Sequence, residues 1–243
     1  MYKSLARVYD VFMKDVPYEK WAENIAGLFG RYNVSPELVL ELGCGTGNVT
    51  VPLALRGFSM IGVDISADML ALAQEKALAR GVSVLFLNQD MREFELYGTV
   101  GACVSVCDCL NYIQKADDLT KIFKLVKNYL DDGGVFLFDL NTEAVFEYLG
   151  EIGSFGETLE DSAFICETAY DGKIMEYNVN IFTREKDENY TRTNEIHREY
   201  PHTLKEIKNC LESANLTYIE TLDAQTLELP TPDTRRVYIA SRA

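Results

Sequence analysis

The stretch "LVLELGCGTGN", residues 38–48, joins an apolar run to a loop with a glycine at every second position. The apolar run predicts a buried strand. Glycine weakens regular structure, so Gly43, Gly45 and Gly47 indicate a turn that needs a positive φ, or a backbone that a ligand approaches closely. The stretch therefore predicts a strand that ends in a ligand-binding loop.

Apolar runs alternate with amphipathic helical stretches from here to about residue 140, after a helical lead-in near residues 18–31. The strand-like runs are "LVLEL", "FSMIGV", "SVLFLN", "VGACVSV" and "GVFLFDL"; helical spacing marks "VTVPLALR", "SADMLALAQEKALAR" and "QKADDLTKIFKLVKNYL". Parallel strands need crossover connections, so this alternation predicts a parallel sheet with helices on both faces. The expected fold class is α/β, doubly wound and Rossmann-like.

The pattern changes after about residue 141. Period-two alternation around "DG" at 171–172 predicts three antiparallel strands, near residues 162–170, 173–183 and 190–200. We expect them to form a small antiparallel β cap, inserted as a substrate subdomain over residues 143–200.

The C-terminal part returns to the main sheet. It predicts a helix, "TLKEIKNCLESAN", capped by Thr203, and two strands, "LTYIETLD" and "RRVYIASR". The loop between these strands is too short for a crossover helix, so they should pair antiparallel at the sheet edge. We therefore expect one domain over residues 1–142 and 201–243, built on a seven-stranded sheet with an antiparallel last strand.

Charge and hydropathy limit the partners. The 243 residues carry 23 Lys and Arg against 38 Asp and Glu, a net charge of −15, which disfavours binding to the phosphates of nucleic acid. No stretch approaches the roughly 18 uncharged apolar residues of a membrane span, and the N-terminal residues lack the apolar region of a signal peptide. We expect a soluble, cytoplasmic protein that binds no membrane.

Six cysteines lie mostly in apolar runs of a chain too large to need disulfides, so we expect reduced thiols. Cys103, Cys107 and Cys109 contain no C-x-x-C pair and have no histidine nearby, so no metal site is predicted. Asp108, between two of them at the end of a strand, would need a cationic or hydrogen-bonding partner. The amine of a substrate would be such a partner.

The surroundings of the glycine loop indicate its ligand. Asp64 ends the next apolar run, about 20 residues further on, where a carboxylate accepts hydrogen bonds from ribose hydroxyls. The loop reads G-x-G-x-G, with Asn48 where a dinucleotide fingerprint has its third glycine. Glu41, Asp64 and Asp68 lie near it and no Lys or Arg falls between Glu41 and Val51, which favours a cationic adenosine cofactor.

The motifs "VLELGCGTGN", "GVDIS", "NQDMREF" and "GGVFLFDLN" together resemble the class I S-adenosylmethionine-dependent methyltransferases. The resemblance covers residues 35–142 by motif and the closing strands by pattern. "SLARVYDVFM", residues 4–13, and the cap are also similar to the small-molecule N-methyltransferases of that family. The resemblance implies S-adenosylmethionine as cofactor and a small-molecule methyl acceptor, an amine or a hydroxyl compound.

The resemblance also implies roles for particular residues. Glu41 and the loop would surround the methionine part of the cofactor, Asp64 the ribose and Ile65 the adenine. Asp90 and Met91 would bind the adenine amino edge, while residues 106–108 line the methyl path and Tyr9 closes over the cofactor. The implied cofactor-binding residues are Tyr9, Glu41, Gly43, Cys44, Gly45, Asp64, Ile65, Asp90, Met91, Val106 and Cys107.

Two residues are candidates for a general base, should the acceptor arrive protonated: Asp108, and His197 with Glu195 and Glu199 on the same strand face. A solvent-facing polar stripe explains His197 equally well. Two other functions stay open, a nicotinamide-dependent oxidoreductase and a noncatalytic protein that binds S-adenosylmethionine or S-adenosylhomocysteine. An exposed apolar cap face would favour a homodimer.

Overall fold

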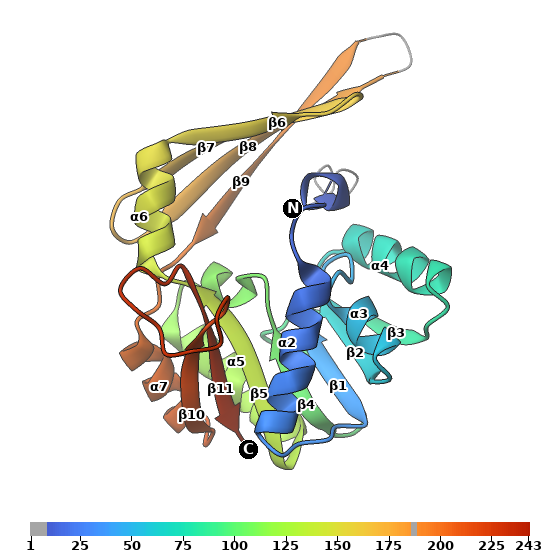
Figure 1. The fold of residues 1–243 in the computed structure, drawn as a ribbon, viewed down its shortest axis with the longest axis vertical. Helices are drawn as coiled ribbons and strands as arrows, with labels where there is room; N and C mark the ends of the chain where they lie inside the picture. Colours follow the sequence, from blue (N-terminus) through green and yellow to red (C-terminus); the bar gives the residue numbers. More distant parts are fainter. Residues whose placement is uncertain (1–8, 186–188) are drawn as a thin grey trace.

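The structure of the protein, a computed structural model, describes residues 9–185 and 189–243 and contains two β-sheets (Figure 1). The larger sheet has seven strands in the order β10-β11-β5-β4-β1-β2-β3. Strand β11 pairs antiparallel with both β5 and β10, whereas the remaining pairs are parallel, so the expected sheet is confirmed. Its strands are β1 (Leu38–Leu42), β2 (Ser59–Asp64), β3 (Val84–Asn88), β4 (Val100–Ser105), β5 (Leu130–Asn141), β10 (Thr217–Asp223) and β11 (Arg236–Arg242).

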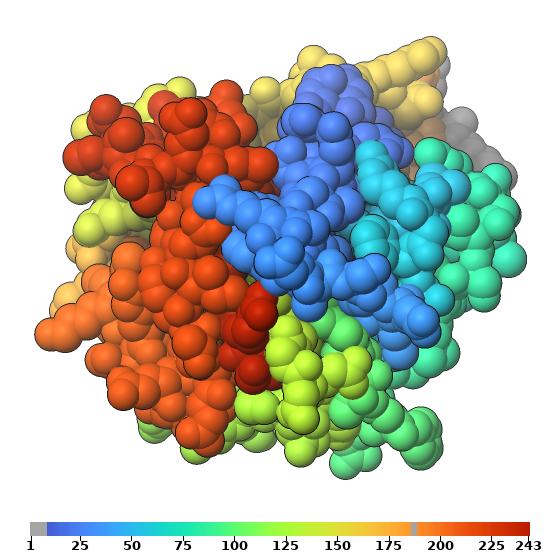
Figure 2. Space-filling model, turned by 60° about the horizontal axis from the view of Figure 1, so that its bottom comes forward, coloured from blue at the N-terminus to red at the C-terminus, as the bar shows by residue number. Residues whose placement is uncertain are grey.

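Helices cover both faces of this sheet. Neighbouring residues of one strand point to opposite faces and so pack against different helices. Val39 joins a core cluster with residues of α2 and α3, whereas Leu40 joins one with residues of α5 and α7. Figure 2 shows the blue segment of α2 between the cyan segment of α3 and the orange-red C-terminal segment. The helices are α2 (Tyr18–Arg31), α3 (Thr50–Leu55), α4 (Ala67–Ala79), α5 (Ala116–Tyr129) and α7 (Leu204–Ser213), the last with the expected Thr203 cap.

The smaller sheet is antiparallel and has four strands, one more than the sequence predicted. The unpredicted strand is short and mostly exposed, and its Gly156 packs so closely on β7 that a Cβ there would lie 2.4 Å from the carbonyl oxygen of Phe164. Figure 1 shows this sheet standing apart from the larger one and joined to it through α6. Its elements are α6 (Glu143–Ile152), β6 (Ser154–Thr158), β7 (Ser162–Tyr170), β8 (Met175–Arg184) and β9 (Tyr190–Glu199).

Among the helices of residues 9–185 and 189–243, none combines the length and the apolar character that crossing a bilayer requires. All six cysteines are free thiols. Within the described part of the chain, His, Cys, Asp and Glu side chains nowhere gather in threes as metal ligands would.

Candidate active site

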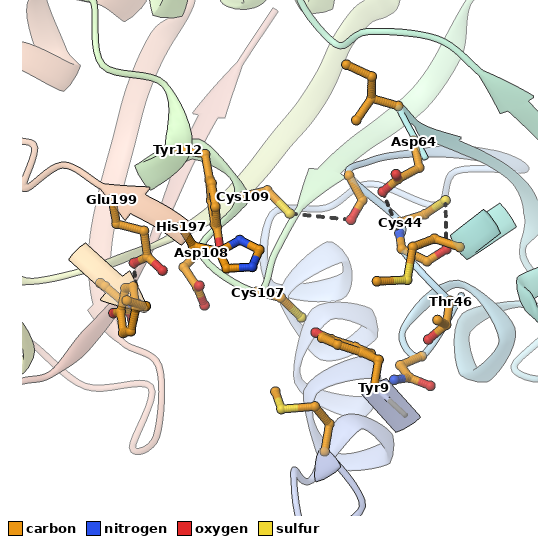
Figure 3. Close-up of a pocket in the computed structure, with 18 of the residues that line it drawn as sticks. Tyr9, Cys44, Thr46, Asp64, Cys107, Asp108, Cys109, Tyr112, His197 and Glu199 are labelled. Atoms are coloured by element: carbon orange, nitrogen blue, oxygen red, sulfur yellow. Dashed lines mark hydrogen bonds between the residues drawn. The ribbon is translucent and has the colours of Figure 1, made fainter. Parts of the chain in front are cut away.

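A cavity of about 830 Å³ lies between the glycine loop and the cap sheet, and Figure 3 shows part of its lining. Residues from both sheets and from the N-terminal helical segment surround it. Val106 does not line it, because its side chain is buried in the core behind the loop. The other predicted site residues do: Tyr9, Glu41, Gly43, Cys44, Gly45, Asp64, Ile65, Asp90, Met91, Cys107, Asp108 and His197.

The glycine loop uses two of its glycines for different purposes. Gly43 has a φ of +72° and packs against the turn after β4, where a Cβ would lie 2.5 Å from the Sγ of Cys109. Gly45, with a φ of +53°, would present a Cβ to open space. The N–H groups of Gly43 and Cys44 donate to the carbonyl of Val63 at 2.8 and 3.0 Å. The loop is therefore held to β2 with its middle exposed to the cavity.

Asp64 keeps hydrogen-bonding capacity that faces the cavity. One carboxylate oxygen accepts from the N–H of Gly45 and the other from the N–H of Ser66, both at 2.8 Å. Each oxygen keeps a lone pair for a further donor. Burial raises the pKa of Asp64. Next to it, Ile65 is 60% exposed on the cavity wall, and a buried adenine ring would cover this apolar side chain.

Two further carboxyl groups on the cavity wall, those of Glu41 and Asp90, lie in different environments. Glu41 is 2% exposed and accepts a hydrogen bond from the Thr50 hydroxyl, and burial raises its pKa to about 8. Asp90 accepts from the Arg92 guanidinium, with Nε at 3.0 Å from Oδ1, and these bonds lower its pKa. Arg92, which was not predicted as a partner of Asp90, occupies part of the hydrogen-bonding capacity of that carboxylate.

The N-terminal segment is attached to the glycine loop by a polar network that the sequence analysis missed. Asp10 accepts from the Thr46 hydroxyl at 2.6 Å and from the Asn48 amide at 2.9 Å, and pairs with the Lys76 ammonium at 2.8 Å. The loop thus has a cation beside it, although that cation comes from α4 and is paired. Tyr9 lines the cavity one residue before Asp10, whereas residues 4–8 of the N-terminal motif lie outside the described residues.

Asp108 occupies a strained turn after β4. Cys107 and Asp108 have φ values of +64° and +54°, a conformation that costs free energy in residues other than glycine. Asp139, which is fully buried, accepts from their N–H groups at 3.0 and 2.8 Å. Arg236 of β11 pairs with Asp139 at 3.0 Å and also contacts the Asp108 carboxylate. The cationic partner expected for Asp108 is therefore within the chain itself.

The cap supplies the opposite wall of the cavity. His197 is 3% exposed, its Nε2 lies 3.5 Å from Oε2 of Glu195, and its ring meets that of Tyr112 edge-on at 6.1 Å. Burial lowers its pKa. The solvent-facing stripe is thus wrong as an explanation of His197, because this face of β9 turns toward the cavity. Glu199, at the end of the same strand, is also 3% exposed.

Two asparagines join the cap to the larger sheet at this point. The Asn111 amide donates to the carbonyls of Tyr200 and Asn141 at 3.0 and 3.2 Å, and its oxygen accepts from the Asn141 N–H at 2.9 Å. The Asn141 amide donates to Glu199 at 3.1 Å. These bonds hold the end of β9 beside the turn that carries Asp108. Neither asparagine was predicted as a site residue, because no local sequence pattern marks its partners.

Comparisons with known proteins show the family to which the chain belongs. Residues 39–134 match the family described as "Methyltransferase domain". A protein of Geobacillus sp. strain WCH70, named as a methyltransferase, is 30% identical over 244 residues, and the match covers 99% of each chain.

Solved structures give the same result. The crystal structure of an S-adenosylmethionine-dependent methyltransferase from Clostridium acetobutylicum ATCC 824 is 27% identical, with a TM-score of 0.86, over 99% of this chain and 98% of that one. A sugar N-methyltransferase from Streptoalloteichus sp ATCC 53650 shares the fold at 16% identity, with a TM-score of 0.81. The match covers 97% of this chain and 93% of that one. The chain belongs to the class I S-adenosylmethionine-dependent methyltransferases, and it is an enzyme with S-adenosylmethionine as its cofactor.

Proposed function

We propose that the enzyme methylates a small molecule, which the cap over residues 143–200 holds against a cofactor domain formed by residues 1–142 and 201–243. The observation that carries this proposal is the cavity itself. Its volume of about 830 Å³ lies within the usual range of small-molecule sites, and both sheets line it. The net charge of −15 also supports a small acceptor rather than a nucleic acid.

In the part of the cavity next to the glycine loop, here called the cofactor half, different residues would contact different parts of the cofactor. Asp64 would accept from the ribose hydroxyls, Ile65 would pack on the adenine, and the exposed middle of the loop at Gly45 would lie along the methionine part. When bound, S-adenosylmethionine supplies a methyl group on a positively charged sulfur, which keeps the electron pair of the broken C–S bond. The acidic lining of this half suits such a cationic ligand.

The part of the cavity next to the cap, here called the acceptor half, would position the methyl acceptor. The leaving group is activated by its own charge, so the protein contributes orientation and the exclusion of water. The aromatic side chains of Tyr112, Phe155, Phe164 and Tyr177 on the cavity wall provide an apolar surface for this purpose. The shared fold with a sugar N-methyltransferase supports a small-molecule acceptor.

Calorimetric titration of the full chain with S-adenosylhomocysteine, with NAD as control, tests the cofactor half. We expect micromolar binding of S-adenosylhomocysteine alone. Incubation with methyl-labelled S-adenosylmethionine and either a fraction of small metabolites or one of RNA and protein then tests the acceptor class. Label that enters only the macromolecular fraction would contradict the proposal.

A further inference from the structure

The cap sheet turns one face toward the cavity, and the strand register arranges that face in rows. Residues directly opposite each other on paired strands lie on the same face and form one row. The rows are counted from the hydrogen bond between Asn141 and Glu199, which joins the cap to the larger sheet. The members that line the cavity are, row by row, Glu199, then Tyr177 and His197, then Phe155, Cys166 and Val179, and then Phe164.

The chemistry of the rows changes with distance from the methyl path. The first two rows present a carboxyl group, a phenol and an imidazole, and Figure 3 shows Glu199 and His197 close to Asp108 and Tyr112. The side chains that line the third and fourth rows are two phenyl rings, an isopropyl group and a thiol. Successive rows are two residues apart along a strand, or about 7 Å. The acceptor half is therefore polar near the methyl path and apolar about 7 Å beyond the row of His197.

Two other elements complete this apolar end. Val145 and Leu149 of α6 line the cavity there with the cap. The ring of Phe12, from the N-terminal segment, meets that of Phe164 edge-on at 4.7 Å, and the Phe155 ring lies 6.0 Å from Phe164. Phe155 nevertheless remains 41% exposed. A ligand that covers this apolar side chain removes it from water and gains free energy.

We propose that the methyl acceptor is amphipathic, with its nucleophilic group at one end and an aromatic or aliphatic body that occupies the row of Phe155, Cys166 and Val179. This inference rests on the proposed function and names the substrate class of that same site. The nucleophilic group lies among the polar side chains of the first two rows, beside the turn that carries Asp108. The body extends from there toward Phe164.

A polyhydroxylated acceptor suits the third row poorly. Each hydroxyl group that enters this row gives up hydrogen bonds to water, and the side chains of Phe155 and Val179 offer none in return. The Cys166 thiol is only a weak donor and acceptor. A buried hydroxyl group without a partner costs free energy. A methylene group buried in its place instead raises affinity about four-fold.

Calorimetric titration of the full chain, saturated with S-adenosylhomocysteine, tests the acceptor class without turnover. The probes are phenylalkanols and phenylalkylamines with one to four methylene groups, and glucose and glucosamine as their polyhydroxylated counterparts. We expect affinity to rise about four-fold with each methylene group, and each sugar to bind at least ten-fold more weakly than the longest probe with the same nucleophilic group. A series that does not bind, a flat series or tighter binding of the sugars would overturn the inference and leave the proposed function standing.

Matched variants locate the apolar body. Val179→Asn places an amide in the third row and should reduce the gain per methylene group to less than two-fold, with S-adenosylhomocysteine affinity within two-fold of the wild type. Phe155→Gln, on the exposed edge strand β6, makes the same test should Val179→Asn fail to fold. Ile165→Asn is the control, because Ile165 is 49% exposed and opposite Asn180 on the other face of the cap sheet, and it should retain the wild-type gain.

Two further outcomes separate this inference from the proposed function. A wild-type gain per methylene group in both Phe155→Gln and a folded Val179→Asn would overturn the inference, because the body would then lie elsewhere. Failure of the wild type to bind S-adenosylhomocysteine, or transfer of label to the macromolecular fraction alone, would instead count against the proposed function.

Discussion

The backbone N–H of Asp108 donates to the carboxylate of Asp139 at 2.8 Å, and this bond helps to hold the residue in a left-handed conformation. The N–H of Cys107 donates to the same carboxylate. Asp139 lies on β5, next to β4 in the sheet, so the strain of the turn is balanced by bonds to a neighbouring strand. Through Arg236, the same carboxylate is linked to the side chain of Asp108.

Replacing Asp139 with Asn should therefore reduce both stability and turnover. Asn retains one carbonyl acceptor but loses the ion pair to Arg236, so we expect a loss of about 3 kcal/mol in the free energy of unfolding. Urea unfolding measures this loss. Calorimetry should show S-adenosylhomocysteine binding within a few-fold of the wild type, because Asp64 and the glycine loop are unchanged. Asp131→Asn, at an exposed position of the same strand, is the control. Wild-type stability in Asp139→Asn would show that the turn needs no such support.

Replacing Asp64 with Ala should weaken S-adenosylhomocysteine binding by more than ten-fold. The carboxylate holds the N–H groups of Gly45 and Ser66 and would accept from the ribose, so its removal affects both the loop and the ligand. Asp68→Ala removes the same charge from an exposed position in the first turn of α4 and should leave affinity within two-fold. Unchanged calorimetric affinity in Asp64→Ala would remove the ribose assignment.

The fold follows from local patterns, which is why the sequence predicts it well. Strand and helix periods, the glycine loop and the Asp-Gly turn each depend on a few neighbouring residues. The helical period does not predict burial correctly where a helix has more apolar residues than its buried face holds. Leu78 of α4 extends the apolar face that the sequence indicates, but it is 68% exposed, whereas the preceding Ala77 is buried.

The site residues likewise differ in how far local sequence patterns predict them. Apart from Tyr9, the residues expected to bind the cofactor lie at or just after the ends of parallel strands, and a parallel sheet brings such ends to one edge. The partners of Asp108 depend instead on sheet order and register. Arg236 lies 128 positions away and reaches Asp108 because β11 pairs with β5, with Arg236 opposite Asn141. No local pattern in one sequence specifies these contacts.

The buried Glu41 should make stability depend on pH. Burial raises the pKa of Glu41 from an ordinary 4.5 to about 8. The contribution of the uncharged Glu41 side chain to the free energy of unfolding is therefore fully present below about pH 4.5 and is lost as pH rises through about 8. In that interval the free energy of unfolding should fall by up to about 1.4 kcal/mol per pH unit relative to Glu41→Gln. Urea unfolding of the cofactor-free protein at pH 6 and pH 8 measures the difference. The exposed Glu37→Gln should follow the wild type at both values, and a constant gap between wild type and Glu41→Gln would contradict a raised pKa.

The network around Asp10 should control how long the cofactor product stays bound. Asp10 joins the N-terminal segment to Thr46, Asn48 and Lys76, and Tyr9 and Phe12 of the same segment line the cavity. On the cap side the segment is held by the edge contact between the rings of Phe12 and Phe164 at 4.7 Å and by the ion pair of Lys14 with Glu157 at 2.9 Å. The ion pair is exposed and screened by solvent, so the partly buried bonds of Asp10 are the stronger attachment.

Replacing Asp10 with Ala should therefore raise the dissociation rate of S-adenosylhomocysteine by about ten-fold, equivalent to a loss of about 1.4 kcal/mol, and change its association rate less. Stopped-flow displacement, followed through the fluorescence of Trp21, measures both rates. Asp15→Ala removes an equal charge from an exposed position of the same segment and should keep the wild-type rates. If Asp10→Ala instead slows association and leaves dissociation unchanged, the network shapes the entrance of the site and does not retain the ligand.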